Sequence, residues 1–165
     1  MKDNNNNELV LTLYPNGVGM GYIISDNPKE IINYGVARIL PLSKERYIKR
    51  LRKFLEIYEP SIVVIRGYLQ SDKRISRRTK KMIEAFKLEA ENRGLNVYTY
   101  TRDDIKNVFD QFGKNTKYHI NKTICKWYPE LKHRMPNLRR NTQSEHYQTG
   151  LFDAFSLMLT HHYIK

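Results

Sequence analysis

A run of four β-branched apolar residues, Ile62-Val63-Val64-Ile65, constrains the fold of this chain more than any other feature. The run follows a helical pattern that closes at Pro60. Because it has no polar alternation, it is typical of a short strand that is buried on both faces in the middle of a sheet. Arg66 stands at the carboxyl end of this strand. Ligands and active sites gather at that edge of open α/β sheets, so an arginine there is the most informative residue of the chain.

The segments before this run predict an antiparallel meander. Residues 9–14, 18–25 and 31–39 have the composition of strands, and short turns at Pro15-Asn16-Gly17 and Asp26-Asn27-Pro28 separate them.

The segments after the meander alternate between helix and strand. Ser43 is a plausible N-cap of a helix that covers the sheet, and the central strand is followed by a helix over residues 71–93, a strand over 95–100 and a helix after Thr101. A short helix over 118–128 and a C-terminal helix over 151–162 complete the chain. This order implies parallel pairing by right-handed crossovers. We therefore expect an α/β fold with a mixed five-stranded sheet, three strands in a meander and two parallel, flanked by helices.

The bulk composition predicts one domain, over residues 8–165, after a disordered polar tail over residues 1–7. The chain has 165 residues, a net charge of +12 and a pI near 9.8. Such a charge predicts a polyanionic partner, with nucleic acid first, although an anionic membrane surface or an acidic protein also fits. The single Cys125 excludes an internal disulfide and fits a reducing compartment. Since no signal peptide or membrane span is apparent, we expect a cytoplasmic protein.

Two basic segments are the predicted nucleic-acid contacts. The first is the polar face of the helix expected over 71–93, and the second is the region 101–140, which has ten Lys or Arg against four acids. The residues that we expect to contact nucleic acid are Lys73, Arg74, Arg77, Arg78, Lys80, Lys81, Lys114 and Lys117.

The order of elements and several local stretches resemble the RuvC-type Holliday-junction resolvases, which have the ribonuclease H-like fold. That family opens with Asp-Pro-Gly and has Gly and an aromatic residue seven and eight positions after the Asp. Here Tyr14-Pro15-Asn16 is followed at the same spacing by Gly21-Tyr22. The resemblance continues through residues 100–106, Gly113-Lys114, the helix from Lys117 to Trp127 and the run 152–157. It covers almost all of residues 9–163.

The resemblance implies a homodimer and hydrolysis of phosphodiesters by two divalent metal ions, which clustered carboxylates hold. The family's carboxylate positions fall here on Tyr14, Arg66, Gly150 and Asp153. Only Asp153 is acidic. One carboxylate beside an arginine does not provide the ligands for two metal ions, and the guanidinium charge repels them. The resemblance thus implies a catalytically inactive relative that binds DNA or another structured nucleic acid and needs no cofactor.

Two alternatives remain open. His146 lies seven residues before Asp153, with Glu145, His161 and His162 near in sequence, so a rebuilt magnesium site would give an active Holliday-junction endonuclease. Against this, His161 and His162 also suit the C-terminus of a helix as cations. The second alternative is a structural module whose basic face binds an acidic protein. For the inactive site, we expect Arg66 to pair with Asp153 and Tyr14 to fill the volume of the missing carboxylate and ion.

Overall fold

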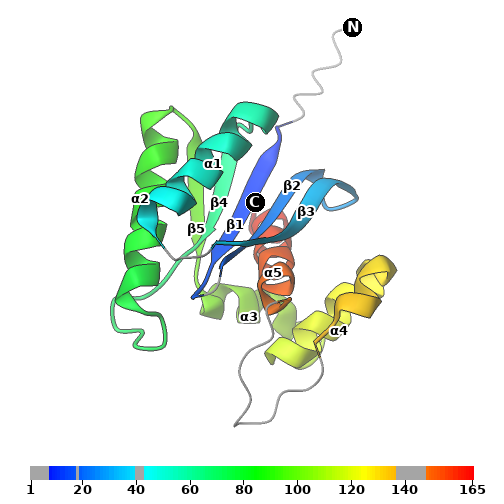
Figure 1. Cartoon of the computed structure of the whole chain (residues 1–165). Helices are drawn as coiled ribbons and strands as arrows, with labels where there is room; N and C mark the ends of the chain where they lie inside the picture. The colour runs from blue at the N-terminus through cyan, green and yellow to red at the C-terminus, as the bar shows by residue number, and fades with distance from the viewer. Residues whose placement is uncertain (1–7, 18, 40–42, 137–147) are drawn as a thin grey trace, which may run out of the picture.

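The computed structural model describes residues 8–17, 19–39, 43–136 and 148–165, and its centre is the predicted five-stranded mixed sheet. The strands are β1 (Val10–Pro15), β2 (Gly19–Asn27), β3 (Glu30–Arg38), β4 (Ile62–Arg66) and β5 (Asn96–Tyr100). They lie in the order β3-β2-β1-β4-β5, with β1, β4 and β5 parallel and the other pairs antiparallel (Figure 1). The predicted fold class is confirmed.

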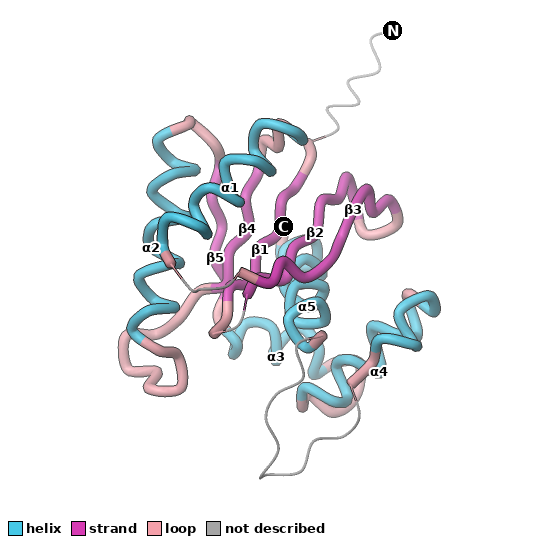
Figure 2. The backbone as a smooth tube through the Cα atoms, in the orientation of Figure 1, coloured by secondary structure: helices cyan, strands magenta, loops and turns pink. Residues whose placement is uncertain are grey.

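Helices cover both faces of this sheet (Figure 2). On one face lie α1 (Lys44–Tyr58) and α2 (Arg77–Asn92). On the other lie α3 (Arg102–Asp110), α4 (Lys117–Trp127), the short 3-10 helix η1 (Pro129–Arg134) and α5 (Thr149–Ile164). Each face of the sheet has its own hydrophobic core, and successive residues of a strand point to opposite cores. In β1, Leu11 and Leu13 face α1 and α2, whereas Val10 and Tyr14 face α5.

The β-branched run forms β4 as expected, between β1 and β5. Its four apolar residues are at most 6% exposed, because parallel strands with helices on both faces bury both sides of the sheet. Arg66 ends the strand and is half-buried.

The helix predicted over 71–93 begins six residues later than expected. Its N-cap is Ser76, whose hydroxyl accepts a hydrogen bond from the Thr79 amide. The segment before it forms turns instead. The Asp72 carboxylate accepts a hydrogen bond from the Arg74 amide, and the Asp72 amide donates one to the Leu69 carbonyl. Local side-chain acceptors of this kind compete with helix formation. Lys73 and Arg74 therefore lie on a loop and not on the helix.

The C-terminal helix α5 is buried nearly all round. Every residue from Leu151 to Met158 is buried, because α5 packs on β1 and β2 and is covered by α3 and α4. Further along, His161 is 2% exposed and its Nδ1 is 2.9 Å from the Tyr100 hydroxyl. Burial lowers the pKa of His161 to about 4, so at neutral pH the expected interaction of its charge with the helix terminus is absent.

Glycine allows the start of α5 to touch β2. A Cβ on Gly21 would lie 2.0 Å from the carbonyl oxygen of Gly150, which no side chain tolerates. This backbone contact fixes the first turn of α5, and with it Asp153, against the β1–β2 hairpin.

The predicted polar tail, residues 1–7, lies outside the described residues. Within the described part of the chain, no helix is long and apolar enough to cross a membrane.

Candidate functional site

The carboxyl ends of the three parallel strands meet at one edge of the sheet, where the structure has a cleft of about 740 Å³. The ends of β1, β4 and β5 contribute Tyr14, Arg66 and Tyr100 to its lining. The loop before α2 and the first turns of α3 and α4 form the other walls. This is the edge at which open α/β sheets bind their ligands.

The lining of this cleft is strongly basic. Its charged residues are five cations, Arg66, Arg74, Arg102, Lys106 and Lys117, and two carboxylates, Asp72 and Asp153, which gives a net charge of +3. In the described part of the chain, no group of three or more His, Cys, Asp or Glu side chains could hold a metal ion.

Three of the four residues at the family's carboxylate positions line the cleft together: Tyr14, Arg66 and Asp153. The fourth, Gly150, is buried one helical turn before Asp153 and packs against the β1–β2 hairpin. A Cβ at position 150 would lie 3.0 Å from the side-chain nitrogen of Asn16, so a side chain at this position requires a small shift of Asn16.

Arg66 is held by β1. Its Nη1 donates a 2.9 Å hydrogen bond to the Pro15 carbonyl, and its Cζ lies 4.3 Å from the centre of the Tyr14 ring. This cation–π contact and the carbonyl orient the guanidinium. Its Nε is buried and has no hydrogen-bond partner among the described residues.

Tyr14 fills the end of β1 and is 4% exposed. Burial raises the pKa of its hydroxyl, the nearby charge of Asp153 raises it further, and Arg66 and Lys117 oppose these effects. The phenol therefore stays protonated at neutral pH. Tyr14 lines the cleft, and the expectation that it fills the volume of a missing carboxylate and ion stays a prediction.

Asp153 is 5% exposed, and its described ion pairs are with two cations other than Arg66. Lys117 Nζ lies 3.5 Å from Oδ2, and Arg102 Nη1 lies 4.0 Å from Oδ1. The prediction that Asp153 pairs with Arg66 is therefore wrong. The reason is that α3 and α4 both start at the cleft, so the first turns of these helices bring their own cations to the carboxylate.

These residues do not fit a two-metal site. Divalent magnesium needs several oxygen ligands, whereas the described site has one carboxylate with two cations within 4.0 Å of it. His146 and Glu145 lie outside the described residues, and His161 is eight residues beyond Asp153, roughly 12 Å along the helix.

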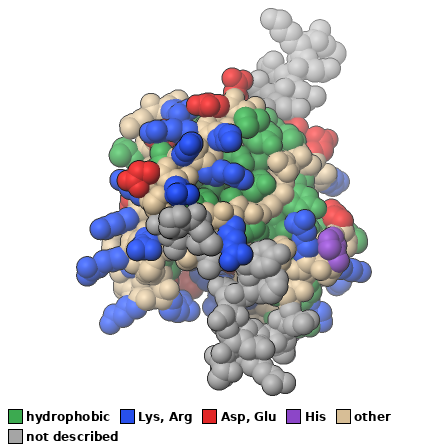
Figure 3. All heavy atoms as spheres, viewed as in Figure 1, with side chains coloured by type: hydrophobic (Ala, Val, Ile, Leu, Met, Phe, Trp, Pro, Cys, Tyr) green, Lys and Arg blue, Asp and Glu red, His purple; other side chains and the backbone are tan. Residues whose placement is uncertain are grey.

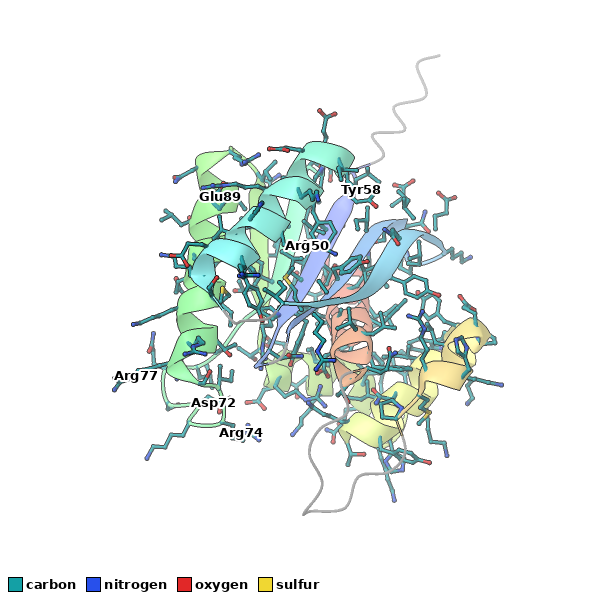
Figure 4. All side chains as sticks on the ribbon, viewed as in Figure 1. Arg50, Tyr58, Asp72, Arg74, Arg77 and Glu89 are labelled. Carbon is teal, nitrogen blue, oxygen red and sulfur yellow. The ribbon has the colours of Figure 1, made fainter. Side chains whose placement is uncertain are left out.

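Of the eight predicted nucleic-acid contacts, two line this cleft, and whether any of them contacts nucleic acid stays a prediction. Arg74 and Lys117 line the cleft, Arg78 lines a neighbouring groove, and Lys80 reaches back to the Gln70 carbonyl. Figure 4 shows Arg74 and Arg77 projecting from the loop and the start of α2 beside Asp72. In Figure 3, Lys and Arg side chains gather over α2. The remaining four, Lys73, Arg77, Lys81 and Lys114, are exposed.

Sequence reasoning missed Arg102 and Lys106 as residues of the site. A usable signal existed for Arg102, because it follows β5 by two residues just as Arg66 ends β4, and parallel strands end at the same edge. Lys106 carried no such signal. It reaches the cleft only because it lies one turn after Arg102 on α3.

Comparison with known proteins identifies the fold. No protein-family model matches the sequence, and no curated protein matches it either. Solved structures do match. Thermus thermophilus RuvC in complex with a Holliday junction substrate is similar with a TM-score of 0.63 and 17% identity, over 94% of this chain and 93% of that one.

Two further resolvases have the same architecture. The yeast mitochondrial Holliday junction resolvase gives a TM-score of 0.60 at 12% identity, over 92% of this chain and 76% of that one. The fowlpox virus Holliday junction resolvase gives 0.55 at 13% identity, over 95% and 99%. At these identities the likeness establishes the fold of the RuvC-type resolvases.

Proposed function

We propose that this protein binds branched or otherwise structured DNA and does not cleave it. The observation that carries the proposal is the environment of Asp153, the one acidic residue at the four carboxylate positions. Two cations lie within 4.0 Å of it, and Arg66 stands at the end of the central strand. Two-metal hydrolysis needs several carboxylates around a pair of cations. We therefore propose that magnesium is not a cofactor of this protein.

Charge supports DNA as the partner. The chain carries +12, and the cleft that contains Tyr14, Arg66 and Asp153 has a net lining charge of +3. The similar T. thermophilus and fowlpox proteins were solved with Holliday junctions, which makes a four-way junction the first ligand to test. By the same resemblance we propose a homodimer, which light scattering of the purified protein would test. The single cysteine, Cys125, supports a reducing compartment, and we propose a cytoplasmic location.

A cleavage assay tests the inactive site. The protein would be incubated with labelled four-way junctions in Mg²⁺ and in Mn²⁺, and we expect intact junctions in both. The control is a preparation of Asp153→Asn purified in the same way. Nicking that requires metal and is lost in this variant would establish the alternative of an active nuclease, with Asp153 in its metal site.

A salt titration tests binding. The affinity for DNA should fall steeply with salt, with a log–log slope of about −0.9 per neutralised phosphate on duplex. Replacing Arg74, Arg77 and Arg78 together by Ala should flatten the slope by roughly two to three units, if each contacts one phosphate.

The matched control is the triple variant Lys29→Ala, Lys53→Ala and Lys126→Ala. Lys29 lies in the β2–β3 turn, Lys53 in the second half of α1 and Lys126 in the last turn of α4. These exposed residues belong to the edge of the sheet opposite the cleft, and their removal changes net charge equally. If the slope flattens equally in both triple variants, binding depends on the total charge and not on the face that carries Arg74, Arg77 and Arg78.

The interaction-module alternative predicts a different result. A protein that binds an acidic protein in preference to DNA would bind branched, duplex and single-stranded DNA weakly at low salt. It would bind an acidic protein of matched charge at least as tightly.

A further inference from the structure

We infer that the cleft is an anion site that takes one phosphate group of the DNA backbone directly on Arg66 and Arg102, without a metal ion. This inference rests on the proposed function and adds a ligand class and residues to it. The charge balance of the cleft, its unpartnered donors, the helix termini beside it and its volume support this inference in four steps.

The first step is the charge balance inside the cleft. Asp72 forms an ion pair with Arg74, and Asp153 forms ion pairs with Arg102 and Lys117. No carboxylate in the described part of the chain lies within 4.0 Å of Arg66 or Lys106 in an ion pair. The cleft therefore has positive charge in excess of its internal counter-ions, which an anionic ligand would balance.

The second step is the state of the two guanidinium groups. Arg66 Nε and Arg102 Nη2 are buried and have no hydrogen-bond acceptor among the described residues. The side chain of Arg102 is only 16% exposed. A buried donor without an acceptor is unfavourable, and a phosphate offers several oxygens that a planar guanidinium fork can bind.

The third step is the pair of helices that start at the cleft with basic residues. The N-cap residues Ser76 of α2 and Thr116 of α4 line it, and neither helix has an acidic residue in its first turn. Instead these turns carry Arg77, Arg78 and Lys117. The positive end of a helix normally favours acidic neighbours, as α1 and α3 have. Amide groups and cations together suit a phosphate.

The last step concerns the size of the ligand. A volume of about 740 Å³ lies within the range of roughly 300–1,000 Å³ that is usual for small-ligand sites. It therefore has room for a phosphate together with the flanking sugar of a backbone. A free phosphate or a mononucleotide shares this chemistry, so the test has to separate these sources.

The test observes the Arg66 Nε–H directly by ¹H–¹⁵N NMR of the full chain in EDTA, with the signal assigned by its disappearance in Arg66→Lys. The protein would be titrated with a four-way junction, with the dinucleoside monophosphate TpT, with thymidine and with inorganic phosphate. We expect the signal to move with the junction and with TpT and not with thymidine. A signal that stays in place at saturating junction would overturn the inference, even if the junction binds elsewhere. Movement with inorganic phosphate alone would overturn the assignment to a DNA backbone.

Affinity measurements provide the second arm. Arg102→Gln should weaken junction binding roughly tenfold or more and reduce the salt slope by about one unit, since a charge-assisted contact to one phosphate is lost. The matched control is Arg93→Gln at the far end of α2, which should leave both values unchanged. Thermal unfolding of each variant checks the fold, and Arg102→Lys retains the charge while losing the fork.

The two proposals fail in different ways. Wild-type protein that binds no junction contradicts the proposed function. If wild type, Arg102→Gln and Arg93→Gln all bind the junction tightly and equally, the result contradicts only the inference that a DNA phosphate binds in the cleft. Binding that needs Mg²⁺ in wild type and loses this need in Asp153→Asn would show that a metal ion, and not a guanidinium, takes the phosphate.

Discussion

The substitution Asp153→Asn should have opposite effects on stability and on DNA affinity. The carboxylate is 5% exposed and lies 3.5 Å from Lys117 Nζ and 4.0 Å from Arg102 Nη1. Without its charge, these two cations and Arg66 repel one another in the same cleft. The folded state is thereby destabilised, and an incoming phosphate meets a more positive site.

The magnitude follows from the exposure of the partners. Breaking a fully buried ion pair costs about 3–5 kcal/mol, and an exposed pair about 0–1 kcal/mol. Here Arg102 is 16% and Lys117 44% exposed at the side chain, so we expect the free energy of unfolding to fall by about 2 kcal/mol. For a chain of this size that is a drop in Tm of about 4–8 °C.

DNA affinity should rise. The net charge of the cleft lining goes from +3 to +4, and one unit charge about 4 Å from a phosphate is worth about 1 kcal/mol in watery surroundings, or roughly fivefold in Kd. Fluorescence anisotropy with a labelled junction in EDTA measures this, and thermal unfolding measures the stability. The control is Asp26→Asn, which makes the same chemical change near the β2–β3 turn, at the opposite edge of the sheet. Lower affinity in Asp153→Asn would refute the reasoning, because it would mean that the carboxylate assists DNA binding and does not oppose it.

Three further perturbations follow from the same structure. Millimolar Mg²⁺ should leave the Tm of wild type unchanged, since the described site lacks the oxygen ligands for it, and a metal-specific rise in Tm relative to Asp153→Asn would contradict this. Stability should fall as the pH drops from about 6.5 to about 4, because burial lowers the pKa of His161 from 6.5 to about 4 and the unfolded chain then binds the proton first. His161→Phe should weaken the pH dependence of the free energy of unfolding in that window, which urea titrations at several pH values measure. An unchanged pH dependence would mean that other groups cause it. Gly21→Ala should destabilise the fold by about 3 kcal/mol or more, because its Cβ would meet the Gly150 carbonyl, whereas Gly17→Ala, with nothing within 4 Å, should be neutral in the same urea titration.

The fold was predictable because each of its strands has a local signal. The β-branched run at Ile62–Arg66 marks the central strand, and the short turns after Pro15 and Asn27 mark the meander. The start of α2 was misplaced because the competing acceptor, Asp72, acts through a hydrogen bond to the Arg74 amide that periodicity does not reveal. Helical pattern alone does not distinguish a capped turn from a first helical turn.

The candidate site was predictable only in part. The positions of Tyr14, Arg66 and Asp153 follow from strand and helix order, so their convergence at the cleft could be expected. The pairing among them could not, because it depends on the angle at which α3 and α4 enter. Arg102 and Lys117 lie 51 and 36 residues from Asp153 in the chain, and no local pattern links them to it.

The hydrogen bond from Arg66 to the Pro15 carbonyl bears on how such a cleft changes over evolutionary time. A side chain at position 150 needs only a small shift of the Asn16 amide, whereas a glutamate at position 66 would face the carbonyl that now accepts from Arg66. The change at position 66 is unfavourable before any metal ion can bind and compensate for it. The intermediates on a stepwise mutational route to a nuclease would therefore lose stability without gaining activity, so neutral drift alone would tend to keep the cleft cationic.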